Sequence, residues 1–363
     1  MQKLTARQRL ERCYFHQETD RPGVYVRRGW PKDDSTYEPL IKLVDGQTDL
    51  KFGWSLRMPG SGVRTESRTE PVSEDFQRVV TTMHTPQGPL TSTRLVSLKG
   101  QPGLHETYYI KDEADVGRYL SLPVPEVGGE TDSFFKFKQD IGERGIVEAG
   151  IGMNPGGKAA ILFGSETFAI MSVTHRDLVH QVLERETRIM EGMVKHMLAA
   201  GVGPFFAMLG QEYIAPPLHG PRDFHDFNVA YDKRLTDLVH DVGGRVHVHC
   251  HSSLRTILHE FLELGADVLH PIEPPPLCDC PASVAKEAFE GKICIEGNLQ
   301  IADMYENSPD NIEAQVRQLI EDAWYDRRGL IVCPSASPYI RGGGGQSYPQ
   351  FERMVETVLA VGQ

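Results

Sequence analysis

The sequence predicts an α/β protein, a single (β/α)8 TIM barrel with an N-terminal helix and a β-hairpin excursion. Its 363 residues, of which 40% are hydrophobic, can bury a large core. From about residue 145 onward, short apolar segments alternate with segments of helical period, the pattern of parallel strands joined by helical crossovers. No strand-like segment runs into a Gly-x-Gly-x-x-Gly turn, which disfavours the alternative of an open doubly wound sheet.

The N-terminal part of the chain contains one predicted helix, one strand and a hairpin. Residues 4–17 carry an apolar stripe at helical spacing, and a short strand follows at 24–26. Between residues 60 and 110, β-branched runs at 78–82 and 90–96 flank a turn. This region is therefore expected to be an antiparallel hairpin inserted into the barrel sequence.

The strands and helices of the predicted barrel then alternate along the chain. Strands are expected at 145–151, 204–209, 245–250, 266–271, 292–296 and 329–333. Helices are expected at 175–199, 221–242, 252–264, 281–290, 308–325 and 348–360. With the strand near residue 24 and one or two unassigned strands, the total is about eight, the number in a TIM barrel. Residues 1–363 are expected to form one such barrel, with its chemistry at the carboxyl ends of the strands.

Composition argues against several classes of partner. The chain has 38 basic and 50 acidic residues, so 38 − 50 = −12, and no basic run could follow a phosphate backbone. Nucleic acid is not an expected partner. No run of about 18 apolar residues predicts a membrane span, and the first ten residues do not resemble a signal peptide. Six cysteines are too few for a disulfide scaffold, so we expect a soluble cytoplasmic protein.

Three histidines alternate along the predicted strand 245–250 and its end. His247, His249 and His251 are two residues apart, so they share one face of the strand, expected to be the barrel interior. Neutral imidazole is a frequent zinc ligand. The pattern therefore favours a divalent metal site, with zinc the first choice, over a set of hydrogen-bonded core histidines.

Acidic and thiol side chains end the neighbouring strands. Glu273 follows the next predicted strand and should lie beside His251, because adjacent parallel strands are about 4.8 Å apart. Glu296 and Cys333 end the two strands after that. The predicted metal ligands are His249, His251 and Glu273, with Cys333 or water completing the shell. A salt bridge to a helix lysine or arginine is the alternative role for Glu273.

Several segments resemble the uroporphyrinogen decarboxylase superfamily. They are Leu4-Thr-Ala-Arg-Gln-Arg-Leu10, Thr19-Asp-Arg-Pro22, Gly210-Gln-Glu-Tyr-Ile-Ala-Pro-Pro217, Val246-His-Val-His-Cys-His251, Asp267-Val-Leu-His-Pro-Ile-Glu-Pro-Pro275 and Ile295-Glu-Gly-Asn298. The resemblance spans nearly the whole chain and implies a (β/α)8 barrel. The superfamily includes zinc-dependent methyltransferases that move methyl groups between corrinoid proteins and thiols or other acceptors.

In those methyltransferases, and in the related cobalamin-independent methionine synthase barrel, a His-x-Cys pair closes one strand. A glutamate closes the next strand in the synthase, and a cysteine follows a later strand. Carried onto this chain, the pair falls on His249 and His251, the glutamate on Glu273, and the late cysteine within Cys333-Pro-Ser-Ala336. In that last segment the most natural register puts Ser335 or Ala336 at the ligand position, with Cys333 slightly early. Imidazole thus replaces the family's thiolate, which favours Lewis-acid or hydroxide chemistry over thiol activation.

The resemblance implies a zinc-dependent methyltransferase that moves a methyl group between a small molecule and a corrinoid supplied by a partner protein. Glu296 and Glu212 are the expected general acid or base. The residues expected to bind substrate are Arg27, Tyr213, Asn298, Tyr339 and Arg341. Gly342 to Gly345 predicts a mobile lid beside them, and a homodimer is one candidate assembly.

Three other functions stay open at this point. The first is metal-free decarboxylation of a porphyrinogen, although Arg27-Arg28 only partly matches the family's arginine segment and a chain of charge −12 does not attract a polyanion. The second is a metal-dependent hydrolase, because His-x-His at a barrel strand end also serves amidohydrolases, whose pair usually lies on the first strand. The third is a barrel that binds a ligand or metal without catalysis.

Overall fold

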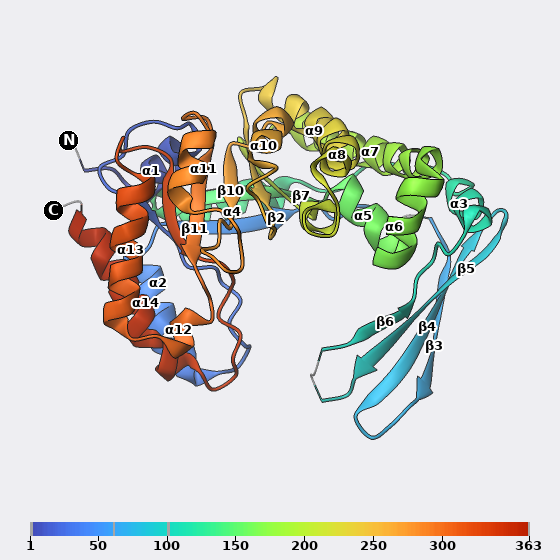
Figure 1. Cartoon of the computed structure of the whole chain (residues 1–363), viewed down its shortest axis with the longest axis horizontal. Helices are drawn as coiled ribbons and strands as arrows, with labels where there is room; N and C mark the ends of the chain where they lie inside the picture. The colour runs from blue at the N-terminus through green and yellow to red at the C-terminus, as the bar shows by residue number, and fades with distance from the viewer. Residues whose placement is uncertain (1–2, 61, 100–101, 362–363) are drawn as a thin grey trace.

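The computed structural model describes residues 3–60, 62–99 and 102–361, which form two sheets and their surrounding helices. The larger sheet has eight parallel strands in the order β1-β12-β11-β10-β9-β8-β7-β2. They are β1 (Gly23–Val24), β2 (Leu50–Ser55), β7 (Gly145–Met153), β8 (Phe205–Leu209), β9 (Arg245–His249), β10 (Val268–His270), β11 (Cys294–Leu299) and β12 (Leu330–Pro334). This curled sheet with its helices (Figure 1) confirms the predicted TIM-barrel fold.

The strands at the two ends of this order, β1 and β2, meet through a single residue. The Asp49 N–H donates to the Val24 carbonyl at 2.8 Å, and the Asp49 carboxylate accepts from the Val24 N–H at 2.9 Å. Arg9 and Arg21 donate to the same buried carboxylate at 2.6 and 2.9 Å. Charge-assisted hydrogen bonds are about twice as strong as neutral ones, so this cluster stabilises the closure.

All six strands predicted after residue 145 are present within a few residues of their expected bounds. The unassigned strand is β2, whose segment Leu-Lys-Phe-Gly-Trp-Ser interrupts the apolar pattern with Lys51. That side chain is nevertheless buried inside the barrel. Because this buried lysine interrupts the apolar run, the apolar pattern did not predict the strand.

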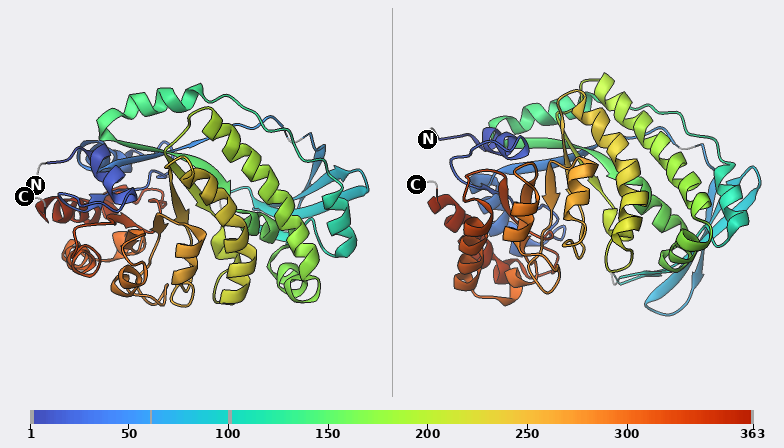
Figure 2. Two further views of the ribbon diagram at one scale, coloured as in Figure 1. Left: turned by 90° about the horizontal axis from the view of Figure 1, so that it is seen from above. Right: turned by 45° about the horizontal axis from the view of Figure 1, so that its top comes forward.

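Helices cover the outer face of the barrel sheet, as the two further views in Figure 2 show. The predicted helices correspond to α1 (Ala6–Tyr14), α7 (Arg176–Ala199), α8 (Pro221–Phe224) with α9 (Ala230–His240), α10 (Leu258–Leu264), α11 (Ala282–Ala288), α13 (Pro309–Ala323) and α14 (Gly344–Val361). The helices not predicted are α2 (Glu38–Gln47), α3 (Glu113–Leu120), α4 (Asp132–Ile141), α5 (Pro155–Phe163), α6 (Ser165–Thr174) and α12 (Asp303–Glu306). None of the described helices combines the length and apolar character needed to cross a membrane.

The excursion between residues 60 and 110 is larger than the predicted hairpin. It is an antiparallel sheet in the order β3 (Thr65–Pro71), β4 (Phe76–Thr85), β5 (Gly88–Ser97) and β6 (Leu104–Thr107). The predicted hairpin is confirmed as β4 and β5. This sheet stands at the end of the molecule opposite the two chain termini (Figure 1), and Leu90 anchors it in a core cluster shared with α3 and α7.

The four consecutive glycines do not form the predicted lid, because α14 begins within them. A Cβ on Gly344 would lie 2.3 Å from the carbonyl carbon of Thr36, so the absence of a side chain permits close packing. The Gly342 N–H also donates to Asp34 Oδ2 at 2.7 Å. Glycine serves helix packing at Gly344 rather than flexibility, and the lid prediction is wrong there.

Candidate active site

Two imidazoles meet at the carboxyl ends of β9 and β10. His249 and His270 are register partners, and their Nδ1 atoms lie 2.8 Å apart. Arg27 Nη1 lies 3.2 Å from the first Nδ1 atom and 3.1 Å from the second. A guanidinium offers only donors, so both ring nitrogens face its positive charge. The two imidazoles thus converge on one electropositive group.

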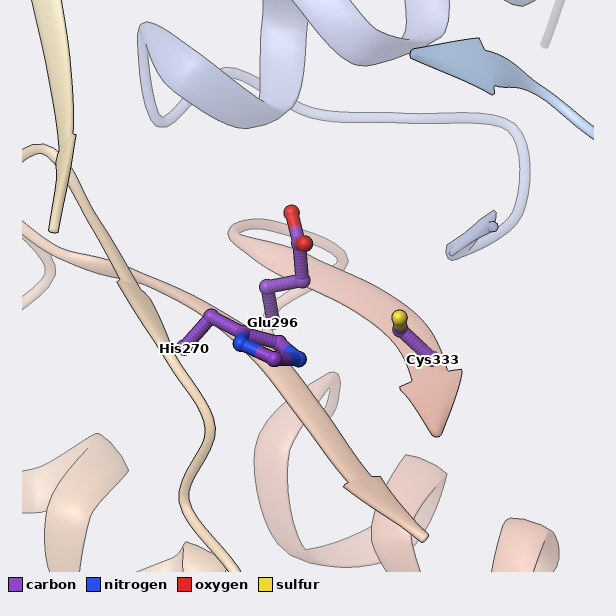
Figure 3. A group of neighbouring side chains, drawn as sticks. All are labelled: His270, Glu296 and Cys333. Atoms are coloured by element: carbon purple, nitrogen blue, oxygen red, sulfur yellow. The ribbon is translucent and has the colours of Figure 1, made fainter. Parts of the chain in front are cut away.

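His270 also belongs to a compact group with Glu296 and Cys333. One ligand atom from each of these residues lies within 4.8 Å of the others, and all three side chains are buried. They come from the adjacent strands β10, β11 and β12 (Figure 3). Imidazole nitrogen, carboxylate oxygen and thiolate sulfur are the ligand types that zinc takes, and catalytic zinc sites often have three protein ligands. The donor set therefore fits zinc.

A lysine and a second glutamate continue this group into the barrel interior. Lys51 Nζ lies 2.5 Å from Glu296 Oε2 and 3.4 Å from Glu148 Oε1, which also accepts from the Tyr14 hydroxyl. Glu296 Oε1 faces His247 Nε2 at 3.8 Å, and that buried nitrogen has no hydrogen-bond partner among the described residues. One Glu296 oxygen is thus held by the lysine, and the other is left for a further ligand.

The barrel environment keeps the three interior imidazoles neutral. Burial, reinforced by the Arg27 charge, lowers the pKa of His249 to about 3. Burial likewise lowers the pKa values of His247 and His270 well below their ordinary value. Neutral imidazole is the form that binds a metal ion, so these rings are ready ligands at neutral pH.

Burial acts in the opposite direction on the acidic groups. It raises the pKa of the Cys333 thiol well above its ordinary value. It also raises the pKa of Glu296, with the Lys51 charge opposing the shift. Burial alone would lower the pKa of Lys51, but the Glu148 and Glu296 carboxylates outweigh it and raise that pKa. The lysine is therefore a permanent buried cation beside the candidate ligands.

Two of the ligands predicted from the sequence meet at the rim of the barrel. His251 Nδ1 lies 3.0 Å from Glu273 Oε2, which confirms the expected proximity. The His249 and His251 ring centroids are 4.7 Å apart. Among the described residues, however, these three do not reach the mutual 4.8 Å spacing of the group around His270. Their role as metal ligands, with Cys333, stays a prediction.

The predicted residues after β8 lie on a short 3-10 turn, Gln211–Ile214. Burial raises the pKa of Glu212, and the nearby His251 opposes the shift. Glu212 Oε2 accepts from the Gly210 N–H at 3.2 Å. Tyr213 is 38% exposed and so accessible to a substrate. Both keep their predicted roles as expectations.

The other predicted substrate residues are spread over the last two strands and their loops. Asn298 lies on β11 in register with Cys333 of β12. Tyr339 is exposed and packs edge-on against Tyr305, with ring centroids 5.7 Å apart. Arg341 donates to the Lys32 carbonyl at 3.3 Å. Contact with substrate stays a prediction for these residues and for Arg27.

His270, Lys51 and Glu148 were not predicted as site residues from the sequence. The sequence did contain a pattern that could have indicated His270, because this residue lies near the end of a predicted strand, beside the strand that carries the three histidines. No such pattern indicated Lys51, because β2 was not predicted. Glu148 lies within a predicted strand, but nothing in the local pattern showed that its side chain would meet Lys51.

A buried carboxylate on α9 holds the turn that carries Glu212. Asp232 accepts from Gln211 Nε2 at 2.9 Å and from Asn154 Nδ2 at 2.9 Å. The Asn154 Oδ1 atom in turn caps α5 by accepting from the Gly157 N–H. Burial raises the pKa of Asp232 to about 7. The ends of β7 and β8 are thus tied to one titratable group.

Asp232→Asn should remove one pH-dependent part of the folding free energy. Because the pKa of Asp232 is raised from 3.8, its contribution to stability is complete below about pH 4 and lost as the pH rises through about 7. Thermal unfolding of both proteins between about pH 5 and about pH 8 should show wild type losing stability relative to the variant. A difference between the two that does not vary with pH would contradict this assignment.

A second group of three residues that could bind a metal lies on the outer helices, away from the barrel strands. It consists of His225, Glu260 and Glu263. His225 Nδ1 already contacts Glu260 Oε2 at 2.8 Å. Since barrel enzymes carry their chemistry at the strand ends, the group around His270 is the better candidate for catalysis.

Comparison with known proteins gives one family and several similar structures. The family model described as uroporphyrinogen decarboxylase (URO-D) matches residues 150–338. A methyltransferase from Methanosarcina mazei is 14% identical, with a TM-score of 0.61 and 99% of each chain covered. A B12-independent methionine synthase from Shewanella sp. W3-18-1, in complex with selenomethionine, is 14% identical, with a TM-score of 0.43 and 65% of this chain and 69% of that chain covered. A comparison with curated proteins gives no match.

Proposed function

Because this chain belongs to the uroporphyrinogen decarboxylase family, we propose that it is a zinc-dependent methyltransferase acting between a small molecule and a corrinoid held by a partner protein. The observation that carries the proposal is the convergence of His270, Glu296 and Cys333 from three adjacent strands. Such a donor set suits a metal-assisted transfer. A metal-free decarboxylase has no need of it.

We assign the zinc ion to His270, Glu296 and Cys333, with a fourth position open to substrate or water. When bound, the ion would supply Lewis-acid activation of the acceptor or donor of the methyl group. The ligands predicted from the sequence, His249, His251 and Glu273 with Cys333, form the competing assignment. The two sets share only Cys333, so substitution of His270 and of His251 can separate them.

Residues around this group prepare it for the reaction. Lys51 neutralises Glu296 and fixes one of its oxygens. Arg27 Nη1 lies 3.2 Å from His249 Nδ1 and 3.1 Å from His270 Nδ1, so its positive charge stands beside both rings. Glu212 lies near His251 rather than in this group, and its pKa is raised by burial, so it is suited to hold and deliver a proton as a general acid.

A cytoplasmic location forms part of the same proposal. All six cysteines are free and buried, and none forms a disulfide. Free thiols are typical of reducing compartments. The corrinoid partner rests on the family resemblance of the sequence.

Transfer to free cobalamin tests the proposed activity. Purified protein with zinc would be incubated with reduced cob(I)alamin and methylated thiols, amines or ethers, and methylcobalamin followed by its absorbance. We expect transfer that stops after chelation and returns when zinc is added. A parallel incubation with uroporphyrinogen tests the decarboxylase alternative. Stepwise loss of carboxylates without a zinc requirement, and no methyl transfer, would overturn the proposal.

A further inference from the structure

The antiparallel sheet ends in an edge strand with one free side. β3 pairs with β4, and no described residue pairs with its other side. Almost all of its residues are exposed. Figure 1 shows β3 at the outer margin of the sheet, with β6 on the side toward the barrel. An exposed edge of this kind is a template for pairing with another strand.

Two hydrogen bonds show which residues face the free side. The Arg64 carbonyl accepts from the His84 N–H at 2.9 Å, and the Val72 N–H donates to the Phe76 carbonyl at 3.1 Å. Even-numbered residues of β3 therefore exchange hydrogen bonds with β4, because such pairs alternate along an antiparallel ladder. The odd-numbered residues direct their N–H and C=O groups to the free edge: Thr65, Ser67 and Thr69.

Charges alternate in sign along one face of β3 and its first flanking residue. The residues are Arg64, Glu66, Arg68 and Glu70, all on the same side of the sheet. The four positions are symmetric about Ser67: each arginine lies as far from Ser67 on one side as a glutamate does on the other. Two antiparallel β3 strands centred on Ser67 would thus set Glu66 opposite Arg68, and Arg64 opposite Glu70.

The backbone and the charges select the same register. Pairs of even-numbered residues would be the non-hydrogen-bonded pairs, in which side chains approach most closely, with Cα atoms about 4.5 Å apart. A shift of two residues in one direction would set Glu66 against Glu66, and in the other Arg68 against Arg68. Like charges directly opposite each other are destabilising, so only the register centred on Ser67 satisfies the whole strand.

We propose that β3 pairs with β3 of a second copy of this chain, joining the two small sheets across a two-fold axis. Thr65, Ser67 and Thr69 would exchange about six main-chain hydrogen bonds with the second copy. Pro71 lacks an N–H and falls at an outward-facing position, so it ends the ladder there. The surface is separate from the barrel strand ends and does not depend on the proposed catalytic activity.

Charge reversal tests this interface. Glu66→Arg would set like charges opposite each other twice in each dimer, and adding Arg68→Glu in the same chain would restore opposite charges. Sedimentation velocity over a concentration series should show a dimer for wild type and for the double variant, and a monomer for Glu66→Arg. The same oligomeric state in all three proteins would overturn the proposal.

Cross-linking tests the register independently. Ser67→Cys would place two thiols in a hydrogen-bonded pair with Cα atoms about 5.5 Å apart, within the range of a disulfide. Thr65→Cys is the matched control, because its two thiols would lie four residues apart along the strands, roughly 14 Å. The native cysteines are buried and should not compete. Mild oxidation should cross-link only Ser67→Cys, and equal yields from the two variants, or none, would overturn the register.

Discussion

Replacing His270 by alanine is expected to release bound zinc and abolish methyl transfer. His270 supplies one of three candidate ligands, and its Nδ1 atom also contacts Arg27 and His249. Loss even of a residue that only supports a ligand costs about 10 to 100-fold in metal affinity, so loss of a ligand should cost at least as much. Metal analysis of protein purified without a histidine tag measures the effect.

His251→Ala is the matched control for this experiment. His251 is a nearby imidazole that contacts Glu273 and lies outside the group around His270. We expect this variant to retain its zinc. If His251→Ala loses the ion while His270→Ala keeps it, the ligand set predicted from the sequence is the correct one. Circular dichroism of both variants would confirm that the barrel is still folded.

Replacing Lys51 by methionine is expected to destabilise the folded protein by about 3–5 kcal/mol, because one partner of a buried charge cluster is removed. The ammonium group is buried between Glu296 and Glu148 and lies over the Tyr14 and Tyr25 rings. Without it, two carboxylates face each other in the barrel. Denaturant unfolding at neutral pH measures the loss in free energy of unfolding.

The pH dependence of this loss identifies its cause. Removing the cation raises the pKa values of the remaining carboxylates further, so the folded variant binds protons more tightly than its unfolded chain. The penalty should therefore be complete at neutral pH and shrink as the pH falls toward the ordinary glutamate value of about 4.3. Lys51→Met/Glu296→Gln should recover much of the stability. Unfolding of Lys51→Met at the same denaturant concentration as wild type would contradict the assignment.

Local pattern alone was enough to predict several features of this protein. The alternation of apolar strands and amphipathic helices predicted the barrel, because strand and helix periods are properties of short segments. The contact between His251 and Glu273 followed from the spacing of adjacent parallel strands. The β4-β5 hairpin was likewise visible from its turn and its β-branched runs.

Other features depend on where distant segments meet, and only the tertiary structure decided them. Barrel closure brings Lys51 to Glu296 across 245 residues of sequence, and Asp49 joins β1 to β2. Which of several histidines joins Glu296 and Cys333 depends on how the strands are staggered around the barrel, and the structure selects His270. The physical reason is that chain periodicity determines which face a side chain takes, while closure and stagger determine its neighbours on that face.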